Sequence, residues 1–276
     1  MKKVFCLLVL LALPVNAEVT YQDLLKPAAA NWLTYSGDFA SRRYSLLNQV
    51  QTGNVGSLVS KWAYSIKDAQ YIETTPLVVD GVMYLTYSNE VFALDAQTGR
   101  SLWHFKYTKS KAEGANRGVA VLGERVFFVT SNVHLIALHA KTGALLWDTP
   151  YGDLEKYPQM SASLAPLAIN GKVIVGVSGG EWGIRGYVAA MDAVSGKELW
   201  RFYTIPGPGE PGFESWGGHP IEISGGPTWM SGSFDVEQNL VIWPVGNPGP
   251  DFNGEMRSGD NLYTDCVVAL DAETGK

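Results

Sequence analysis

Short apolar runs that alternate with polar positions recur along most of the chain. Residues 81–87, 124–130 and 171–177 alternate in this way, and each follows a shorter apolar run across a turn that contains glycine. Alternation over four to eight residues predicts half-buried β-strands, and a glycine turn between two such runs predicts a hairpin. A helical pattern occurs only at about residues 21–30. The chain is therefore predicted to be all-β.

One turn sequence, close to Asp-Ala-x-Thr-Gly, is repeated four times and organises the chain. It ends at Gly99, Gly143, Gly196 and Gly275, at intervals of 44, 53 and 79 residues. The aspartate can accept hydrogen bonds within the turn, and the glycine supplies a positive φ. The first three turns are followed by a strand with a tryptophan, at Trp103, Trp147 and Trp200. Strand-rich repeats of this length predict a β-propeller of four-stranded antiparallel blades, with these tryptophans packed between the blades.

The third interval is longer than one simple blade requires. It contains two segments rich in Gly and Pro, residues 206–212 and 246–254. Such segments predict long loops rather than strands. We expect these loops on one face of the propeller, the face on which functional residues gather.

The N-terminus predicts a secretory signal over residues 1–17. Lys2 and Lys3 precede an apolar run over residues 4–13, and a small residue, Ala17, follows at a suitable cleavage position. The apolar run is too short to cross a bilayer, although an uncleaved membrane anchor is the alternative interpretation. Cleavage would leave residues 18–276 as one periplasmic propeller domain with no membrane span.

Composition excludes some classes of function. The chain has 21 Lys and Arg against 27 Asp and Glu, a net charge of −6, which becomes −8 once the two signal lysines are removed. An acidic chain has no electrostatic footprint for nucleic acid or anionic membranes. Of the two cysteines, Cys6 lies in the predicted signal, so Cys266 alone would remain. An intrachain disulfide and a cysteine-based metal site are thereby excluded.

Further motifs occur in order between the repeats. They are Asn-Arg-Gly at residues 116–118, Gly-Gly-Glu at 179–181, Gly-Gly-Pro-Thr-Trp at 225–229 and Gly-Asn-Pro at 246–248. Together with the tryptophan-bearing repeats they resemble the quinoprotein dehydrogenases that depend on pyrroloquinoline quinone (PQQ), the methanol and ethanol dehydrogenase group. The resemblance implies an eight-bladed propeller, of which about four blades are present here. It also implies a periplasmic enzyme that uses PQQ and Ca²⁺ to oxidise a primary alcohol to an aldehyde, with a c-type cytochrome as electron acceptor.

The resemblance assigns roles to nine residues. Trp229 is the expected aromatic floor under the planar cofactor, and Arg117 is the expected hydrogen-bond donor to its quinone oxygens. The polar rim of the cofactor is assigned to Glu73, Thr130 and Ser163, and the close backbone approach to Gly179 and Gly180. The metal ligands are assigned to Glu181 and Asn247, which supply the carboxylate and amide oxygens that Ca²⁺ prefers. Without the resemblance, core packing, turn formation or solvation would explain each of these residue types.

Three features depart from the family pattern. Many members carry an adjacent Cys-Cys pair over the cofactor, where this chain has Lys111 and Ala112. Pro227 stands where a cofactor-contacting Thr is common, and Thr228 is expected to point elsewhere. The aspartate that acts as general base is expected after Lys276, so the resemblance implies a fragment that is inactive alone, with no catalytic residue assigned within it.

Three alternatives stay open from the sequence. Propellers with similar tryptophan-bearing repeats also serve as non-enzymatic scaffolds for outer-membrane protein assembly, which would bind partner proteins. The substrate of a PQQ enzyme can be a sugar or polyol in place of a primary alcohol. The metal can be a lanthanide in place of calcium.

Overall fold

The computed structural model describes residues 18–110 and 114–276. The predicted signal over residues 1–17 and the pair Lys111 and Ala112 lie outside these described residues. Two sheets come first: β1 (Leu77–Val79), β2 (Val82–Tyr87), β3 (Glu90–Asp95) and β4 (Ser101–Lys106), then β5 (Ala120–Leu122), β6 (Arg125–Val129), β7 (His134–His139) and β8 (Leu145–Pro150). Two more follow: β9 (Leu167–Ile169), β10 (Lys172–Gly176), β11 (Tyr187–Asp192) and β12 (Glu198–Tyr203), then β13 (Ser233–Asp235), β14 (Leu240–Val245) and β15 (Cys266–Asp271).

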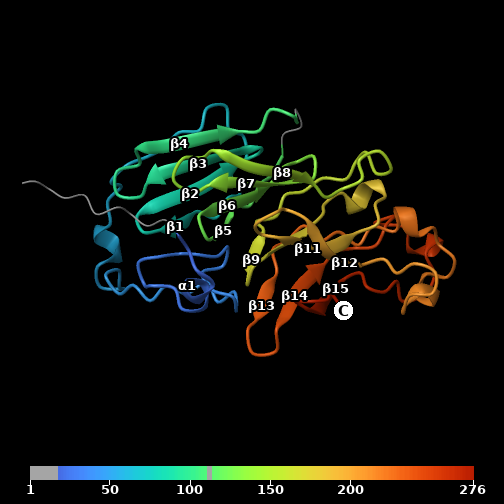
Figure 1. Cartoon of the computed structure of the whole chain (residues 1–276). Helices are drawn as coiled ribbons and strands as arrows, with labels where there is room; N and C mark the ends of the chain where they lie inside the picture. Colours follow the sequence, from blue (N-terminus) through green and yellow to red (C-terminus); the bar gives the residue numbers. More distant parts are fainter. Residues whose placement is uncertain (1–17, 111–113) are drawn as a thin grey trace, which may run out of the picture.

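Each sheet is a sequential antiparallel meander, as the alternating pattern predicts. Three sheets have four strands and the fourth has three, and neighbours in sequence are neighbours in the sheet. The sheets follow one another as in a fan (Figure 1), and the first strands of the second and third sheets, β5 and β9, lie in contact. Apolar side chains on both faces of the strands are buried between the sheets and form one extended core, with a smaller separate cluster of Leu85, Phe92 and Leu94 on β2 and β3. The described residues thus form consecutive propeller blades, and the all-β prediction is confirmed.

Each blade is joined to the next by a tryptophan that lies against a turn glycine. The ring of Trp103 packs on Gly143, where an added Cβ would lie 2.7 Å from the indole, and Trp147 and Trp200 pack in the same way on Gly196 and Gly275. The indole N–H of Trp103 also donates to the carbonyl of Ala140 at 2.8 Å. The predicted inter-blade role of these tryptophans is confirmed. A fourth case, Trp62 on Gly99, does not follow the repeat pattern, because Trp62 stands nine residues after its Thr-Gly pair, Thr52-Gly53, and not four.

Helical structure is shorter than the sequence pattern predicts. The helix α1 covers Tyr21–Leu25 and begins in a capping box between Thr20 and Asp23. It stops before residue 30 because Lys26 precedes Pro27, and the residue before a proline is disfavoured in the α conformation. The other helical pieces are single 3₁₀ turns: η1 (Val55–Ser57), η2 (Gly180–Trp182), η3 (Phe213–Trp216), η4 (Ile221–Ile223) and η5 (Gly254–Met256). No helix in the described part of the chain is long and apolar enough to cross a membrane.

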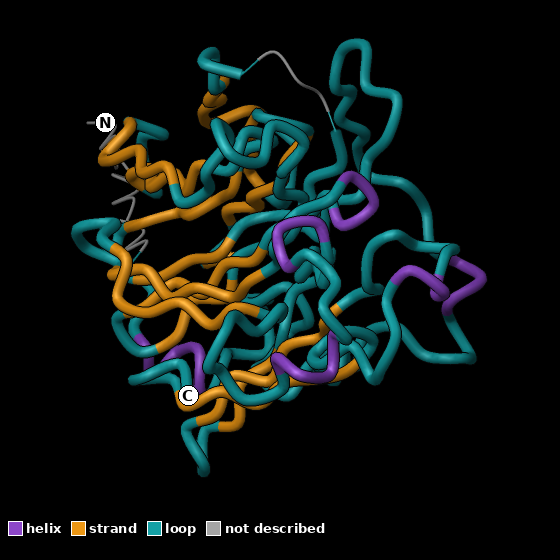
Figure 2. The backbone as a smooth tube through the Cα atoms, turned by 90° about the vertical axis from the view of Figure 1, so that its right-hand side faces the viewer, coloured by secondary structure: helices purple, strands orange, loops and turns teal. Residues whose placement is uncertain are grey.

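The long loops gather on one side of the strands. Figure 2 shows most of the helical turns and loops on one side, with the strands on the other. The loops include the Gly- and Pro-rich connection from β12 to β13 and the connection from β14 to β15, both predicted as long loops. The sequence motifs lie in these loops and in the connections that precede β1, β5, β9 and β11.

Candidate functional site

Arg117 is the centre of a cluster that joins four segments distant in sequence. Its Nη2 lies 2.7 Å from Oε2 of Glu73, and its Nη1 donates to Oγ of Ser163 at 2.8 Å. Its Cζ lies over the ring of Trp229, 4.7 Å from the centroid. Four of the nine residues singled out in the sequence are therefore in direct contact. A cation, hydroxyl and aromatic ring together suit a planar anionic ligand.

The backbone around Arg117 is held on both sides. The amide of Arg117 donates to the carbonyl of Ser163 at 3.0 Å, and its own carbonyl accepts from the amide of Thr75 at 3.0 Å. Asn116 is buried, donates to the carbonyl of Val129 at 2.9 Å and accepts from the amide of Gly118 at 3.1 Å. Such a fully bonded backbone fixes where the guanidinium points, and the Arg117 side chain keeps only 15% of its surface exposed.

Trp229 is a partly exposed side chain on a segment that its neighbour, Thr228, anchors in the core. It is 38% exposed, although it is one of the largest apolar side chains in the chain. The neighbouring Thr228 is fully buried, donates to the carbonyl of Tyr187 at 2.6 Å and accepts from the amide of Val177 at 2.9 Å. Thr228 therefore points into the core, as expected, and it anchors the segment that presents Trp229. A held, partly exposed indole is suited to stacking with a planar group.

Ser178, which we did not predict as a site residue, also belongs to the cluster. Its Oγ lies 3.0 Å from Oγ of Ser163, which in turn accepts from Arg117. A pair of backbone hydrogen bonds between Ser178 and Ser161, of 2.7 and 3.1 Å, aligns the two serine-bearing segments. The available signal was its position directly before Gly179 and Gly180, at the end of a predicted strand.

The glycines after Ser178 are needed for close packing. Gly179 has φ +106°, and an added Cβ would lie 2.6 Å from the carbonyl oxygen of Gln159. At Gly180 an added Cβ would lie 2.6 Å from the ring of Pro227. The structure therefore explains both glycines by contacts within the protein. Their approach to a cofactor remains a prediction.

The two metal-ligand candidates lie on adjacent loops. Glu181 is exposed in the turn η2, and Asn247 follows β14. The loops approach closely, because a Cβ added to Gly249 would lie 3.5 Å from the carbonyl oxygen of Gly180. The described residues contain no group of three or more His, Cys, Asp and Glu side chains that could hold a metal. A carboxylate and an amide supply fewer oxygens than the six to eight that Ca²⁺ takes, so further oxygens would come from a bound ligand or water.

Most of the chain matches a known protein family. Residues 32–276 match the PQQ family, described as the β-propeller domain of glucose, ethanol and alcohol dehydrogenases. The chain belongs to this family. A quinohemoprotein alcohol dehydrogenase, ADH-IIG, from Pseudomonas putida is 39% identical over 96% of this chain. The quinoprotein alcohol dehydrogenase PedH of the same species is 34% identical over 96% of it.

Solved structures of family members share the fold. The Pseudomonas putida quinohemoprotein ADHIIG superimposes with a TM-score of 0.89 at 36% identity, over 95% of this chain. A europium-containing methanol dehydrogenase superimposes with a TM-score of 0.84 at 32% identity, over 92% of it. The chain spans 40% of the length of ADH-IIG and 49% of that of PedH.

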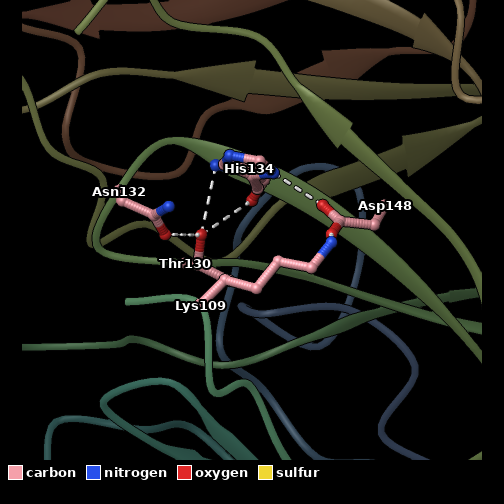
Figure 3. Close-up of polar contacts among 5 residues, drawn as sticks. All are labelled: Lys109, Thr130, Asn132, His134 and Asp148. Atoms are coloured by element: carbon pink, nitrogen blue, oxygen red, sulfur yellow. Dashed lines mark hydrogen bonds and ion pairs between the residues drawn. The ribbon is translucent and has the colours of Figure 1, made fainter. Parts of the chain in front are cut away.

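Among the family positions predicted to contact the cofactor, Thr130 has its hydroxyl engaged elsewhere. It donates to Oδ1 of Asn132 at 2.8 Å and accepts from the amide of His134 at 3.1 Å (Figure 3). Thr130 is fully buried, and these bonds close the turn between β6 and β7. The preceding residue, Val129, links this turn to the Arg117 loop by accepting a hydrogen bond from Asn116 at 2.9 Å. A cofactor contact for Thr130 stays a prediction.

A charged group beside this turn anchors the loop that carries Arg117. Asp148 on β8 accepts from Nζ of Lys109 at 2.7 Å and lies 2.6 Å from Nδ1 of His134 (Figure 3). Burial acts to raise the pKa of Asp148, but the hydrogen bonds from Lys109 and His134 outweigh it and leave that pKa lowered. The ionised carboxylate therefore ties the start of the loop, at Lys109, to the blade.

Proposed function

We propose that this chain binds PQQ together with a metal ion and forms part of a dehydrogenase that oxidises a primary alcohol to an aldehyde. The observation that carries the proposal is the convergence of Glu73, Arg117, Ser163 and Trp229 at one place. These residues come from four separate loops, and their shared chemistry matches a flat ligand with several carboxylates and quinone oxygens. When bound, the quinone accepts the hydride that leaves the alcohol carbon.

The residues of the chain can bind and orient such a group. Trp229 is 38% exposed and can offer an aromatic surface as a floor, and Arg117, whose guanidinium lies over that ring, offers hydrogen-bond donors. Among the described residues, the contacts of Arg117 to Glu73 and Ser163 use at most three of its five N–H groups, which leaves others for a ligand oxygen. Ser163 and Ser178 add hydroxyl groups that can donate to a carboxylate.

The metal proposed for the site is Ca²⁺, with Glu181 and Asn247 as protein ligands. Their loops are adjacent, which supports the assignment, and both oxygen types suit a hard cation. A lanthanide is the alternative, since one structural relative is a methanol dehydrogenase that contains europium. Because both cations prefer oxygen ligands, the ligand types do not decide between them. A direct competition between Ca²⁺ and Eu³⁺ for the protein with PQQ would show which cation binds more tightly.

We further propose that residues 18–276 form one periplasmic propeller domain after removal of residues 1–17, and that a c-type cytochrome accepts the electrons. Relatives named quinohemoproteins support electron transfer to haem. We expect the 276 residues alone to show no turnover. Among the described residues, the carboxylate that contacts Arg117 is that of Glu73, and this ion pair leaves Glu73 poorly suited as a general base.

The test is a PQQ titration of the 276-residue chain in Ca²⁺, followed by tryptophan fluorescence. Saturable quenching is expected, and Trp229→Phe and Arg117→Ala should weaken it at least tenfold. Arg42→Ala is the matched control, because that arginine is 73% exposed and bonds only to Asp38 among the described residues. Absence of quenching in the wild type would contradict the proposal and favour the scaffold function. If PQQ binds, assays with alcohols, sugars and polyols on a chain extended to the length of its relatives would identify the substrate class.

A further inference from the structure

The loop that follows β14 is fixed by the neighbouring segment. The amide of Gly246 donates to the carbonyl of Pro227 at 2.7 Å, and the amide of Gly249 donates to the carbonyl of Ser224 at 2.8 Å. Between them, the carbonyl of Asn247 accepts from the amide of Gly226 at 3.0 Å. The backbone of Asn247 is therefore held from both sides, and only its side chain is left to be oriented.

The side-chain amide of Asn247 is oriented by acceptors. Its Nδ2 donates to the Oδ1 of Asp251 and to the carbonyl of Pro248, the latter at 3.4 Å. An ionised carboxylate and a carbonyl can only accept hydrogen bonds, so the nitrogen end of the amide must face them. The two ends of an amide have nearly the same shape, and the chemistry of the partners decides which end points where.

This orientation leaves the oxygen of Asn247 available. None of the described residues donates a hydrogen bond to its Oδ1, and both protons of Nδ2 have acceptors. An amide turned the other way would present N–H groups, which repel a cation. We propose that Asp251 is a positioning residue that presents Oδ1 of Asn247 to the metal ion. This inference rests on the proposed function, in which Asn247 is a metal ligand.

The position of Asp251 is fixed by hydrogen bonds from Arg257 to the backbone of this segment. Arg257 donates to the carbonyls of Pro250 and Asp251, both at 3.4 Å, and to Oδ1 of Asn261 at 2.8 Å. No ion pair to the carboxylate of Asp251 occurs among the described residues, so its charge is not neutralised by a neighbouring cation. A carboxylate behind a metal ligand both fixes the ligand and makes its oxygen more electron-rich.

The test measures cation affinity and not turnover. The 276-residue chain is titrated with Ca²⁺ by calorimetry and with Eu³⁺ by luminescence, each with PQQ present. Asp251→Asn replaces an acceptor-only group by an amide that no longer specifies the orientation of Asn247. We expect this variant to bind both cations about 10- to 100-fold more weakly, the range typical when a partner of a metal ligand is lost. Thermal unfolding of each variant monitors folding.

Two further variants separate positioning from charge. Asp260→Asn removes the same charge from an exposed side chain of the same connection and should leave the affinity unchanged. The exchange Asn247→Asp with Asp251→Asn restores a donor–acceptor pair and gives position 247 two oxygens, so the affinity should recover to within a few-fold of the wild type. Equal losses in the two single variants, or no loss in Asp251→Asn, would overturn the positioning role. Failure of the wild type to bind either cation would instead contradict the proposed metal site.

Discussion

The guanidinium carbon of Arg117 lies 4.7 Å from the centroid of the Trp229 ring. The same guanidinium bonds to Glu73 and Ser163, so one side chain holds three others in place. A planar fork can make these contacts together, whereas the ammonium of lysine is a compact point charge. Arg117 is thus the residue on which the geometry of the candidate site depends most.

Arg117→Lys is expected to weaken PQQ binding at least tenfold while keeping the charge. Lysine can bond to Glu73 or Ser163 but does not reproduce the stacked fork, and the loss of buried hydrogen bonds should also lower the free energy of unfolding by about 1–3 kcal/mol. Fluorescence titration and urea unfolding measure the two effects. Arg42→Lys serves as the control, and equal PQQ affinity in both variants would show that geometry at Arg117 is unimportant.

Gly143→Ala is expected to destabilise the protein more than Gly171→Ala. The two glycines have similar φ values of +68° and +70°, but only at Gly143 would a Cβ contact another group, the ring of Trp103 at 2.7 Å. The backbone term should cost about 1–2 kcal/mol in each case, and overpacking should add about 1–3 kcal/mol at Gly143. Urea unfolding gives both values. Equal losses would mean that the ring moves aside without cost.

His139→Asp is expected to stabilise the second repeat turn. In the first turn Oδ1 of Asp95 accepts from two backbone amides and from the hydroxyl of Thr98. At the equivalent position the side chain of His139 bonds, within the described part of the chain, only to the hydroxyl of Thr142, at 3.2 Å. A carboxylate there should raise the free energy of unfolding by about 1 kcal/mol, the usual net contribution of such hydrogen bonds. Asp95→His should change the stability in the opposite direction, and a destabilised His139→Asp variant would contradict the interpretation.

Stability is expected to fall in acid because of the turn aspartates. Hydrogen bonds from Thr98, Ser195 and Thr274 lower the pKa values of Asp95, Asp192 and Asp271. A lowered pKa in the folded state gives stability that is present above the unfolded pKa, about 4, and is lost as the pH falls through the folded value. Urea unfolding between about pH 7 and pH 3 should show a plateau and then a decline below about pH 4. Asp95→Asn should reduce the steepness of that decline, and an unchanged slope would contradict it.

The blades were predictable because their signals are local. Alternating strands and the repeated Thr-Gly turns lie within a few residues of one another, so their spacing alone indicates four-stranded units. Trp62 was not predicted because it stands nine residues after Thr52-Gly53, whereas the other three tryptophans stand four residues after their turn glycine. The extent of α1 was overestimated because the apolar pattern continues past Pro27, whereas the helical backbone ends before this proline.

The candidate site was predictable only where a motif carried it. Arg117 and Trp229 lie in recognisable motifs, and the structure brings them together. Ser178 is an ordinary serine in sequence, and only the pairing of its segment with Ser161 reveals its place beside Ser163. The hydroxyl of Thr130 and the amide of Asn247 depend on side-chain rotamers and on partners such as Asp251, which no sequence spacing specifies.

The packing of Trp103, Trp147 and Trp200 on a glycine of the following blade makes the stability of neighbouring blades interdependent. Because the ring comes from one sheet and the glycine from the next, local opening of one blade uncovers an indole of its neighbour and weakens that neighbour in turn. Nearest-neighbour coupling of this kind favours unfolding that spreads stepwise from a single opened blade to the adjacent blades. Amide hydrogen exchange should then be slowest in the second and third sheets, each of which is flanked by a described sheet on both sides.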